Sequence, residues 1–158
     1  MPFTLIHGFI GYLAIALFTK DRKLRWLGLL GGLVPDIDAI PFIYSIDLYL
    51  QIHKTLHPVV FGLAFGIVLA FASERFFRVN RIWAGAAFMA GFFLHLAADL
   101  IFTDWPIKLF WPFSQESFIY PFLSSYQIEL NMLVTALLLV FILHERRGKN
   151  TNNLNSKR

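Results

Sequence analysis

Seven side chains of two types, histidine and aspartate, lie in or beside the apolar segments of this chain of 158 residues. An ionisable group inside a bilayer is strongly unfavourable unless it is paired, hydrated or bound to a metal. Imidazole and carboxylate are both ligands for divalent metal ions. The set therefore predicts a metal site with one or two ions, built from His7, Asp36, Asp38, His53, His57, His95 and Asp99.

Four of these residues form two pairs with helical spacing. His95 and Asp99 lie four residues apart in FFLHLAADLIFTD, on one face of the helix that this segment predicts. His53 and His57 have the same spacing in QIHKTLHPVV. Each pair could bind one ion, or one member could bind while the other orients it. The alternatives are a buried hydrogen-bonded His–Asp pair that joins helices, and a loop with two solvated histidines.

The segment GGLVPDIDAIP places two aspartates, Asp36 and Asp38, between Pro35 and Pro41 in an apolar run. It predicts a broken helix, and irregular backbone at membrane depth is tolerated only where it is buried in protein or lines a wet cavity. Paired carboxylates can bridge two cations or supply a general base. We therefore take both as candidate catalytic residues, with Asp38 as the bridging ligand or general base. A helix cap would explain one aspartate but not both.

His7 and three further polar residues complete the candidate site. Gly8 and Gly11 beside His7 would allow another helix to approach closely, although a single histidine there is more often a packed residue than a ligand. Weaker candidates for substrate binding are Lys54, Thr103 and Ser114.

The composition predicts a membrane protein. Hydrophobic residues make up 57% of the chain and charged residues 15%, whereas soluble domains carry about 25% charged residues. The mean hydropathy is +0.60. Because the chain has no cysteine, a metal would be held by imidazole and carboxylate alone. Such a ligand set favours zinc, with manganese or iron as alternatives.

The hydrophobic pattern predicts an all-α bundle of about five membrane spans in a single domain, residues 1–146, with a disordered basic cytoplasmic tail over residues 147–158. The connection from Asp104 to Gln127 is rich in aromatic residues and contains three prolines. We expect it to form an interfacial or re-entrant segment over the site. The expected spans are Phe3–Phe18, Trp26–Tyr44, Pro58–Ala72, Ile82–Thr103 and Ile128–Leu143.

Positive charge alternates along these segments. Four Lys and Arg residues lie in Lys20–Arg25, three in Ser73–Arg81 and five from Arg146 onward, which is twelve of the fourteen in the chain. Because basic loops stay cytoplasmic, the N-terminus is expected outside and the C-terminus inside. This orientation also explains the net charge of +4 without nucleic acid as a partner.

The same orientation predicts that the candidate ligands meet at one depth. At about 1.5 Å per helical residue, His7 lies roughly 18 Å above the cytoplasmic end of its span. The two aspartates of the broken helix lie about 15–18 Å up, and His95 and Asp99 about 20–26 Å up. We therefore expect the site toward the outer leaflet, although its residues come from four separate stretches.

Several of these motifs occur together in a known family. The segments TLIHGFIG, LVPDIDAIP, HKTLHP, FLHLAADLIFTD and WPFS, in this order between Met1 and Ser114, resemble the YdjM-like inner-membrane proteins. The resemblance implies an inner-membrane location and the activity ascribed to that family, metal-dependent hydrolysis. This chain has Pro58 where the family usually has a small polar residue.

The pattern also has a more distant similarity to zinc-dependent phospholipase C and the P1-type nucleases. That similarity implies a phosphoester substrate and no more than two ions, because the downstream ligands of those enzymes have no counterpart after Asp99. The implied zinc ligands are His7, Asp36 or Asp38, His53 or His57, and His95 with Asp99.

Together these expectations favour a membrane-embedded metal-dependent hydrolase that acts on a lipid phosphoester or another amphipathic ester. Two alternatives remain open at this point. One is a non-catalytic protein with a structural metal site. The other is a scaffold whose basic cytoplasmic face binds a soluble partner or anionic lipid. Membrane lipid is an expected partner under each of them, and the sequence gives no prediction of the oligomeric state.

Overall fold

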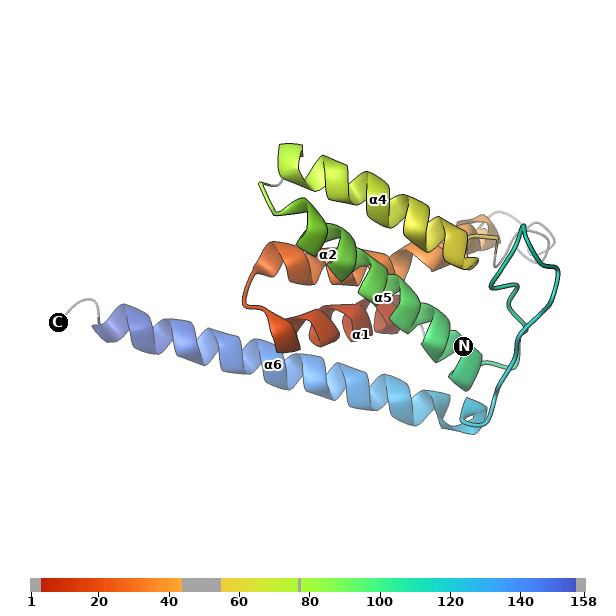
Figure 1. Cartoon of the computed structure of the whole chain (residues 1–158). Coiled ribbons are helices and arrows are strands. Elements are labelled where there is room, and N and C mark those ends of the chain that lie inside the picture. The colour runs from red at the N-terminus through yellow and green to blue at the C-terminus, as the bar shows by residue number, and fades with distance from the viewer. Residues whose placement is uncertain (1–3, 44–54, 77, 156–158) are drawn as a thin grey trace.

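The computed structural model describes residues 4–43, 55–76 and 78–155, and these residues form a helical bundle (Figure 1). They contain no β-strand, and one isolated bridge joins Ile107 and Phe118. The all-α prediction is therefore confirmed. The elements are α1 (Thr4–Phe18), α2 (Arg22–Leu33), η1 (Val34–Ile43), α4 (Val59–Phe76), α5 (Arg81–Phe102), η2 (Ser124–Tyr126) and α6 (Gln127–Asn155).

Three helices of the described chain are long and apolar enough to cross a membrane, namely Val59–Phe76, Arg81–Phe102 and Ser124–Arg147. The other two expected spans are shorter, because α1 has 15 residues and α2 has 12, against the roughly 20 that a bilayer requires. The second expected span changes from α-helix to the narrower 3₁₀ form at Val34. Pro35 follows directly and has no backbone N–H to continue the helix.

Polar side chains define where the helices begin. The Asp21 carboxylate accepts a hydrogen bond from the backbone N–H of Lys23, at 2.8 Å, at the start of α2. Asn80 accepts from the N–H groups of Ile82 and Trp83 at the start of α5. Such caps satisfy backbone donors that have no partner within the helix. They define the starts of α2 and α5, and α5 carries His95 and Asp99.

Helix α5 lies at the centre and packs against α1, α2 and α4. Its fully buried side chains include Phe88 and Phe92, and Leu96 completes the same cluster. Glycines let α2 approach both neighbours, because a Cβ at Gly11 of α1 or at Gly91 of α5 would overlap the carbonyl oxygen of Gly28 in α2. This close approach of small residues is typical of helices in membranes.

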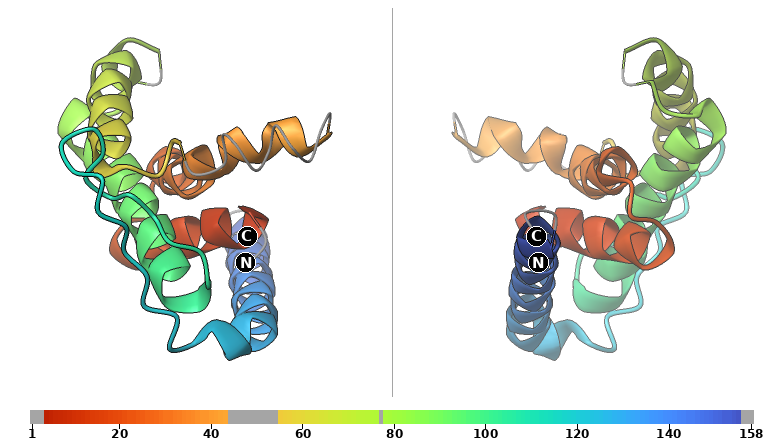
Figure 2. Two further views of the ribbon diagram at one scale, coloured as in Figure 1. Left: turned by 90° about the vertical axis from the view of Figure 1, so that its right-hand side faces the viewer. Right: turned by 90° about the vertical axis from the view of Figure 1, so that its left-hand side faces the viewer.

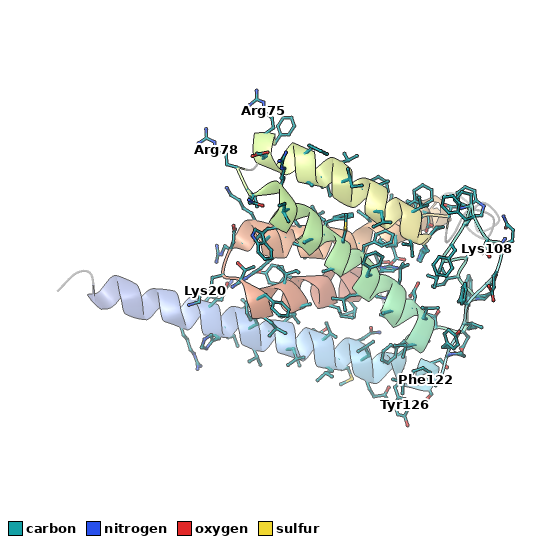
Figure 3. All side chains as sticks on the ribbon, viewed as in Figure 1. Lys20, Arg75, Arg78, Lys108, Phe122 and Tyr126 are labelled. Carbon is teal, nitrogen blue, oxygen red and sulfur yellow. The ribbon has the colours of Figure 1, made fainter. Side chains whose placement is uncertain are left out.

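The two ends of the bundle differ in character. Lys20, Arg75 and Arg78 lie at one end, which we call the basic end, and Lys108, Phe122 and Tyr126 lie at the other (Figure 3). The separation of charge that the sequence predicted is therefore present in the fold. In a view along the bundle, η1 projects sideways, away from α4 and α5 (Figure 2).

Helix α6 is loosely packed, and only 6% of its apolar window is buried. It contacts α1 through Tyr12, whose ring lies 6.0 Å from that of Phe141. The helix continues to Asn155, beyond both the predicted end of the span at Leu143 and the start of the predicted disordered tail at residue 147. The end of the apolar sequence is therefore not the end of the helix.

Candidate metal centre

Six of the seven predicted ligands lie in the described chain, and four elements of structure carry or adjoin them. His7 is near the start of α1, Asp36 and Asp38 are in η1, and His57 precedes α4 by two residues. His95 and Asp99 are in the last two turns of α5. All six are buried, and none is more than 6% exposed.

Asp36 faces all three imidazoles of the cluster. Its Oδ2 lies 3.4 Å from Nδ1 of His7. Its Oδ1 lies 3.8 Å from Nε2 of His57 and 3.7 Å from Nε2 of His95. A carboxylate in this position can bind an ion with one oxygen or bridge two ions with both.

Asp99 is the second carboxylate that faces all three imidazoles. Its Oδ1 lies 3.5 Å from Nε2 of His7. Its Oδ2 lies 3.3 Å from Nε2 of His57 and 3.6 Å from Nε2 of His95. The pairing of His95 with Asp99 that helical spacing predicted is therefore present, but each residue has further partners from other elements.

The tautomer of His95 is fixed by the backbone of α2. Nδ1 of His95 donates a hydrogen bond to the carbonyl oxygen of Gly32, at 2.8 Å. The lone pair of the neutral ring is then on Nε2, which lies 3.2 Å from Nε2 of His57. Metal-bound histidines commonly donate their second ring N–H in this way. Gly32 is a contributor that we did not predict, although the Gly31–Gly32 pair before the helix break marks where a backbone can come close.

Asp38 lies on the other side of the His57 ring from the rest of the cluster. Its Oδ2 is 3.5 Å from Nδ1 of His57 and accepts a hydrogen bond from the N–H of Leu56, at 3.0 Å. Nε2 of His57 faces Asp36, Asp99 and His95. Asp38 is thus placed to orient His57, as carboxylates beside metal-bound histidines do.

Several polar atoms at the centre of the cluster lack a hydrogen-bond partner among the described residues. They are Nε2 of His7, Oδ1 of Asp36 and both carboxylate oxygens of Asp99. Buried polar atoms nearly always have a partner, and buried carboxylates need a compensating charge. These nitrogen and oxygen atoms come from three different elements and lie close together. A cation bound between them would be coordinated by them and would provide the missing partner.

Two sets of side chains in the described chain are close enough to hold a metal ion. They are His7, Asp36 and His95, and His57, His95 and Asp99, with the ligand atoms of each set within 4.8 Å of one another. The sets share His95, and its Nδ1 is engaged by Gly32. The two sets therefore form one continuous centre around Nε2 of His95. Asp36 and Asp99 face all three imidazoles and could each bridge two ions bound there.

The remaining predicted site residues are placed as follows. His53 and Lys54 lie outside the described residues. The Thr103 hydroxyl donates to the carbonyl oxygen of Asp99, at 2.7 Å, and so completes the end of α5. The Ser114 hydroxyl accepts from the N–H of Glu116, at 3.1 Å. Both hydroxyls are thus used in local backbone contacts.

Comparison with known proteins adds one decisive observation, because the family model described as YdjM inner membrane protein matches residues 1–154. The chain belongs to this family. Together with the three long apolar helices, membership supports a location in the inner membrane. No curated protein and no solved structure matches the chain. The distant similarity to phospholipase C and the P1-type nucleases is therefore not supported by these comparisons.

Proposed function

We propose that this protein is a membrane-embedded metal-dependent hydrolase. The observation that carries the proposal is the arrangement of Asp36 and Asp99, each of which faces His7, His57 and His95 within a buried cluster. One hydrogen-bonded His–Asp pair would be enough to join two helices. This cluster contains three imidazoles and two carboxylates from separate elements. The same set provides more ligands than the three protein donors of a typical catalytic zinc site.

The donor chemistry fits a divalent cation. With neutral imidazoles, Asp36 and Asp99 give the inner cluster two negative charges, which one divalent ion would balance, and the buried Asp38 adds a third on the far side of His57. Protonated histidines could balance them instead, but the proton on Nδ1 of His95 is already donated to Gly32, and its Nε2 faces Nε2 of His57 at 3.2 Å. Two imidazole nitrogens at that distance share a proton or a metal ion more easily than they carry two positive charges.

The side chains would divide the work as follows. His7, His57, His95, Asp36 and Asp99 would hold one or two ions, and Asp38 would orient His57. A bound divalent ion would polarise the ester and acidify a water molecule. A carboxylate oxygen not used as a ligand would accept the proton from that water. Asp36 is the better candidate for this base than Asp38, since the His57 ring separates Asp38 from the centre.

The position of the site favours an amphipathic substrate. His95 and Asp99 are in the last two turns of α5, and the aromatic segment that follows lies at the end of the bundle opposite the basic end (Figure 3). The positive-inside rule favours an orientation with the site toward the outer leaflet and the N-terminus outside. A lipid phosphoester or another ester that partitions into the bilayer would reach it there.

A specific observation favours a second candidate, a structural metal site. The side chains of His7, His57, His95 and Asp99 are completely buried. Structural sites are closed by protein ligands, whereas catalytic sites keep a position open to water or substrate. The two candidates share the metal and differ in turnover, so one set of variants can distinguish them.

The test begins with the metal content of protein purified without chelators, measured by mass spectrometry. Wild type should contain stoichiometric metal, and His95→Ala and Asp36→Ala should each lose most of it. His144→Ala is the matched control, because His144 is exposed on α6. Metal-free wild-type protein that remains folded would overturn both candidates. Hydrolysis of chromogenic and lipid phosphoesters that chelation abolishes supports the enzyme, and full metal without turnover of any ester supports the structural site.

A further inference from the structure

A second site lies at the basic end of the bundle, away from the metal centre. A cleft of about 350 Å³ is bounded by α1, α2 and α6. Its inner wall is apolar and includes Phe9, Leu29 and Leu138. Helix α6 is little buried along its length. The cleft between α6 and the helices α1 and α2 is therefore wide enough to accept an apolar chain.

The mouth of the cleft carries positive charge. Arg22 and Arg146 line it, and both are exposed. Glu145 also lines the cleft, and its carboxylate forms an ion pair with the buried guanidinium of Arg25. Arg22 also lies 3.7 Å from Glu145, but its side chain is 58% exposed and such a pair is weak. Arg22, Arg25 and Arg146 thus carry three positive charges at or beside the mouth against the one negative charge of Glu145, which gives these four side chains a net charge of about +2 near neutral pH.

Two aromatic side chains separate the apolar wall from the charged mouth. Tyr12 and Trp26 line the cleft, and their rings meet edge to face with centroids 5.9 Å apart. Tyr and Trp prefer the headgroup level of a bilayer. From inside to outside the cleft therefore changes from apolar to aromatic to cationic, which matches a phospholipid from acyl chain to phosphate.

We propose that this cleft binds one anionic phospholipid from the leaflet at the basic end. The phosphate would contact Arg22 and Arg146, and an acyl chain would lie along Phe9, Leu29 and Leu138. Basic pockets between membrane helices recognise anionic headgroups in this way. The bound lipid would fill the seam between α6 and the helices α1 and α2. The proposal does not depend on the metal centre or on its activity.

The test is a titration of delipidated full-length protein with phosphatidylglycerol and with phosphatidylcholine, followed by native mass spectrometry. Wild type should bind one phosphatidylglycerol in preference to phosphatidylcholine. The double variant Arg22→Gln/Arg146→Gln should bind phosphatidylglycerol roughly 25-fold more weakly, at about fivefold for each charge removed. The matched control Arg75→Gln/Arg78→Gln removes two charges from the same end but away from the cleft, and should change the affinity less than twofold.

A second variant tests the cleft without changing charge. Leu138→Trp should fill the apolar wall and lower the affinity for phosphatidylglycerol at least tenfold. Equal losses in the two double variants would overturn the proposal in favour of general surface charge. Equal binding of both lipids would also overturn it, as would binding of glycerol phosphate as tight as that of the whole lipid. Displacement of the lipid by an acidic peptide would assign the cleft to a soluble partner instead.

Discussion

The Asp38 carboxylate lies 3.5 Å from Nδ1 of His57, while Nε2 of the same ring lies 3.3 Å from the Asp99 carboxylate. The imidazole thus connects an outer carboxylate, which also accepts the N–H of Leu56, to the inner cluster. The two aspartates of the PDID motif consequently have different surroundings. Asp36 faces the three imidazoles. Of these three, Asp38 faces that of His57, on its Nδ1 side, which is the side away from the cluster.

The first prediction concerns this outer carboxylate. Asp38→Asn keeps the shape of the side chain but removes the charge that holds the proton on Nδ1 of His57. We expect metal affinity to fall about 10–100-fold, as it does when such outer partners are changed, without loss of the fold. Equilibrium dialysis with zinc measures the effect. Asp104→Asn, at an exposed position just after α5, is the control. An Asp38→Asn protein with wild-type affinity would contradict the orienting role.

The second prediction concerns the contact between α2 and α5. In Gly91→Ala the new methyl group would overlap the carbonyl oxygen of Gly28 and lie 3.0 Å from the nitrogen of Gly32. Overpacking of this kind destabilises by about 1–3 kcal/mol, which exceeds the gain in helix propensity of about 1 kcal/mol. It should also weaken metal binding, because it moves Gly32 away from His95.

Thermal unfolding in detergent and zinc affinity should both be measured for this variant. Ala86→Leu, at an exposed position on α5, should leave both unchanged. A Gly91→Ala protein that is as stable as wild type and binds zinc equally well would show that the two helices are not held at this distance.

The third prediction concerns the buried ion pair at the basic end. The side chain of Arg25 is 4% exposed and that of its partner Glu145 is 27% exposed, and the Arg25 guanidinium also lies 5.1 Å from the centre of the Phe141 ring. Glu145→Gln leaves a buried charge without its carboxylate, which we expect to destabilise the protein by about 3 kcal/mol. Thermal unfolding measures the loss.

Two further variants make this result interpretable. Glu74→Gln removes an exposed carboxylate from α4 and should have almost no effect. The double variant Arg25→Met/Glu145→Leu should recover much of the lost stability, because apolar pairs often replace buried ion pairs without loss. If the Glu145→Gln protein is as stable as the Glu74→Gln protein, the Arg25–Glu145 ion pair does not stabilise the contact between α2 and α6.

The fourth prediction concerns orientation in the membrane. Because the chain has no cysteine, single cysteines can be introduced without background. Lys108→Cys should react with a membrane-impermeant maleimide in intact spheroplasts, and Arg78→Cys should react only after the membrane is opened. These residues lie at opposite ends of the bundle (Figure 3). The reverse labelling pattern would place the metal centre toward the cytoplasm and require a different substrate.

Local sequence was sufficient to predict the helical class, the His95–Asp99 pair and a broken helix around Pro35. These depend on composition, on the spacing of four residues along a helix and on the missing N–H of proline, all of which act over a few residues. The convergence of His7 and Asp36 on that pair followed from a simple count of helix rise. Each of those predictions used distances along one segment only.

The tertiary structure alone determined how the side chains face one another. Nothing in the PDID motif indicates that Asp36 turns toward three imidazoles and Asp38 toward the far side of His57, because that depends on where α4 begins relative to η1. The hydrogen bond from His95 to Gly32 likewise requires α2 to lie directly against α5, which the glycine contacts between those helices permit. Packing between distant segments sets ring orientation and tautomer, and spacing within one segment cannot.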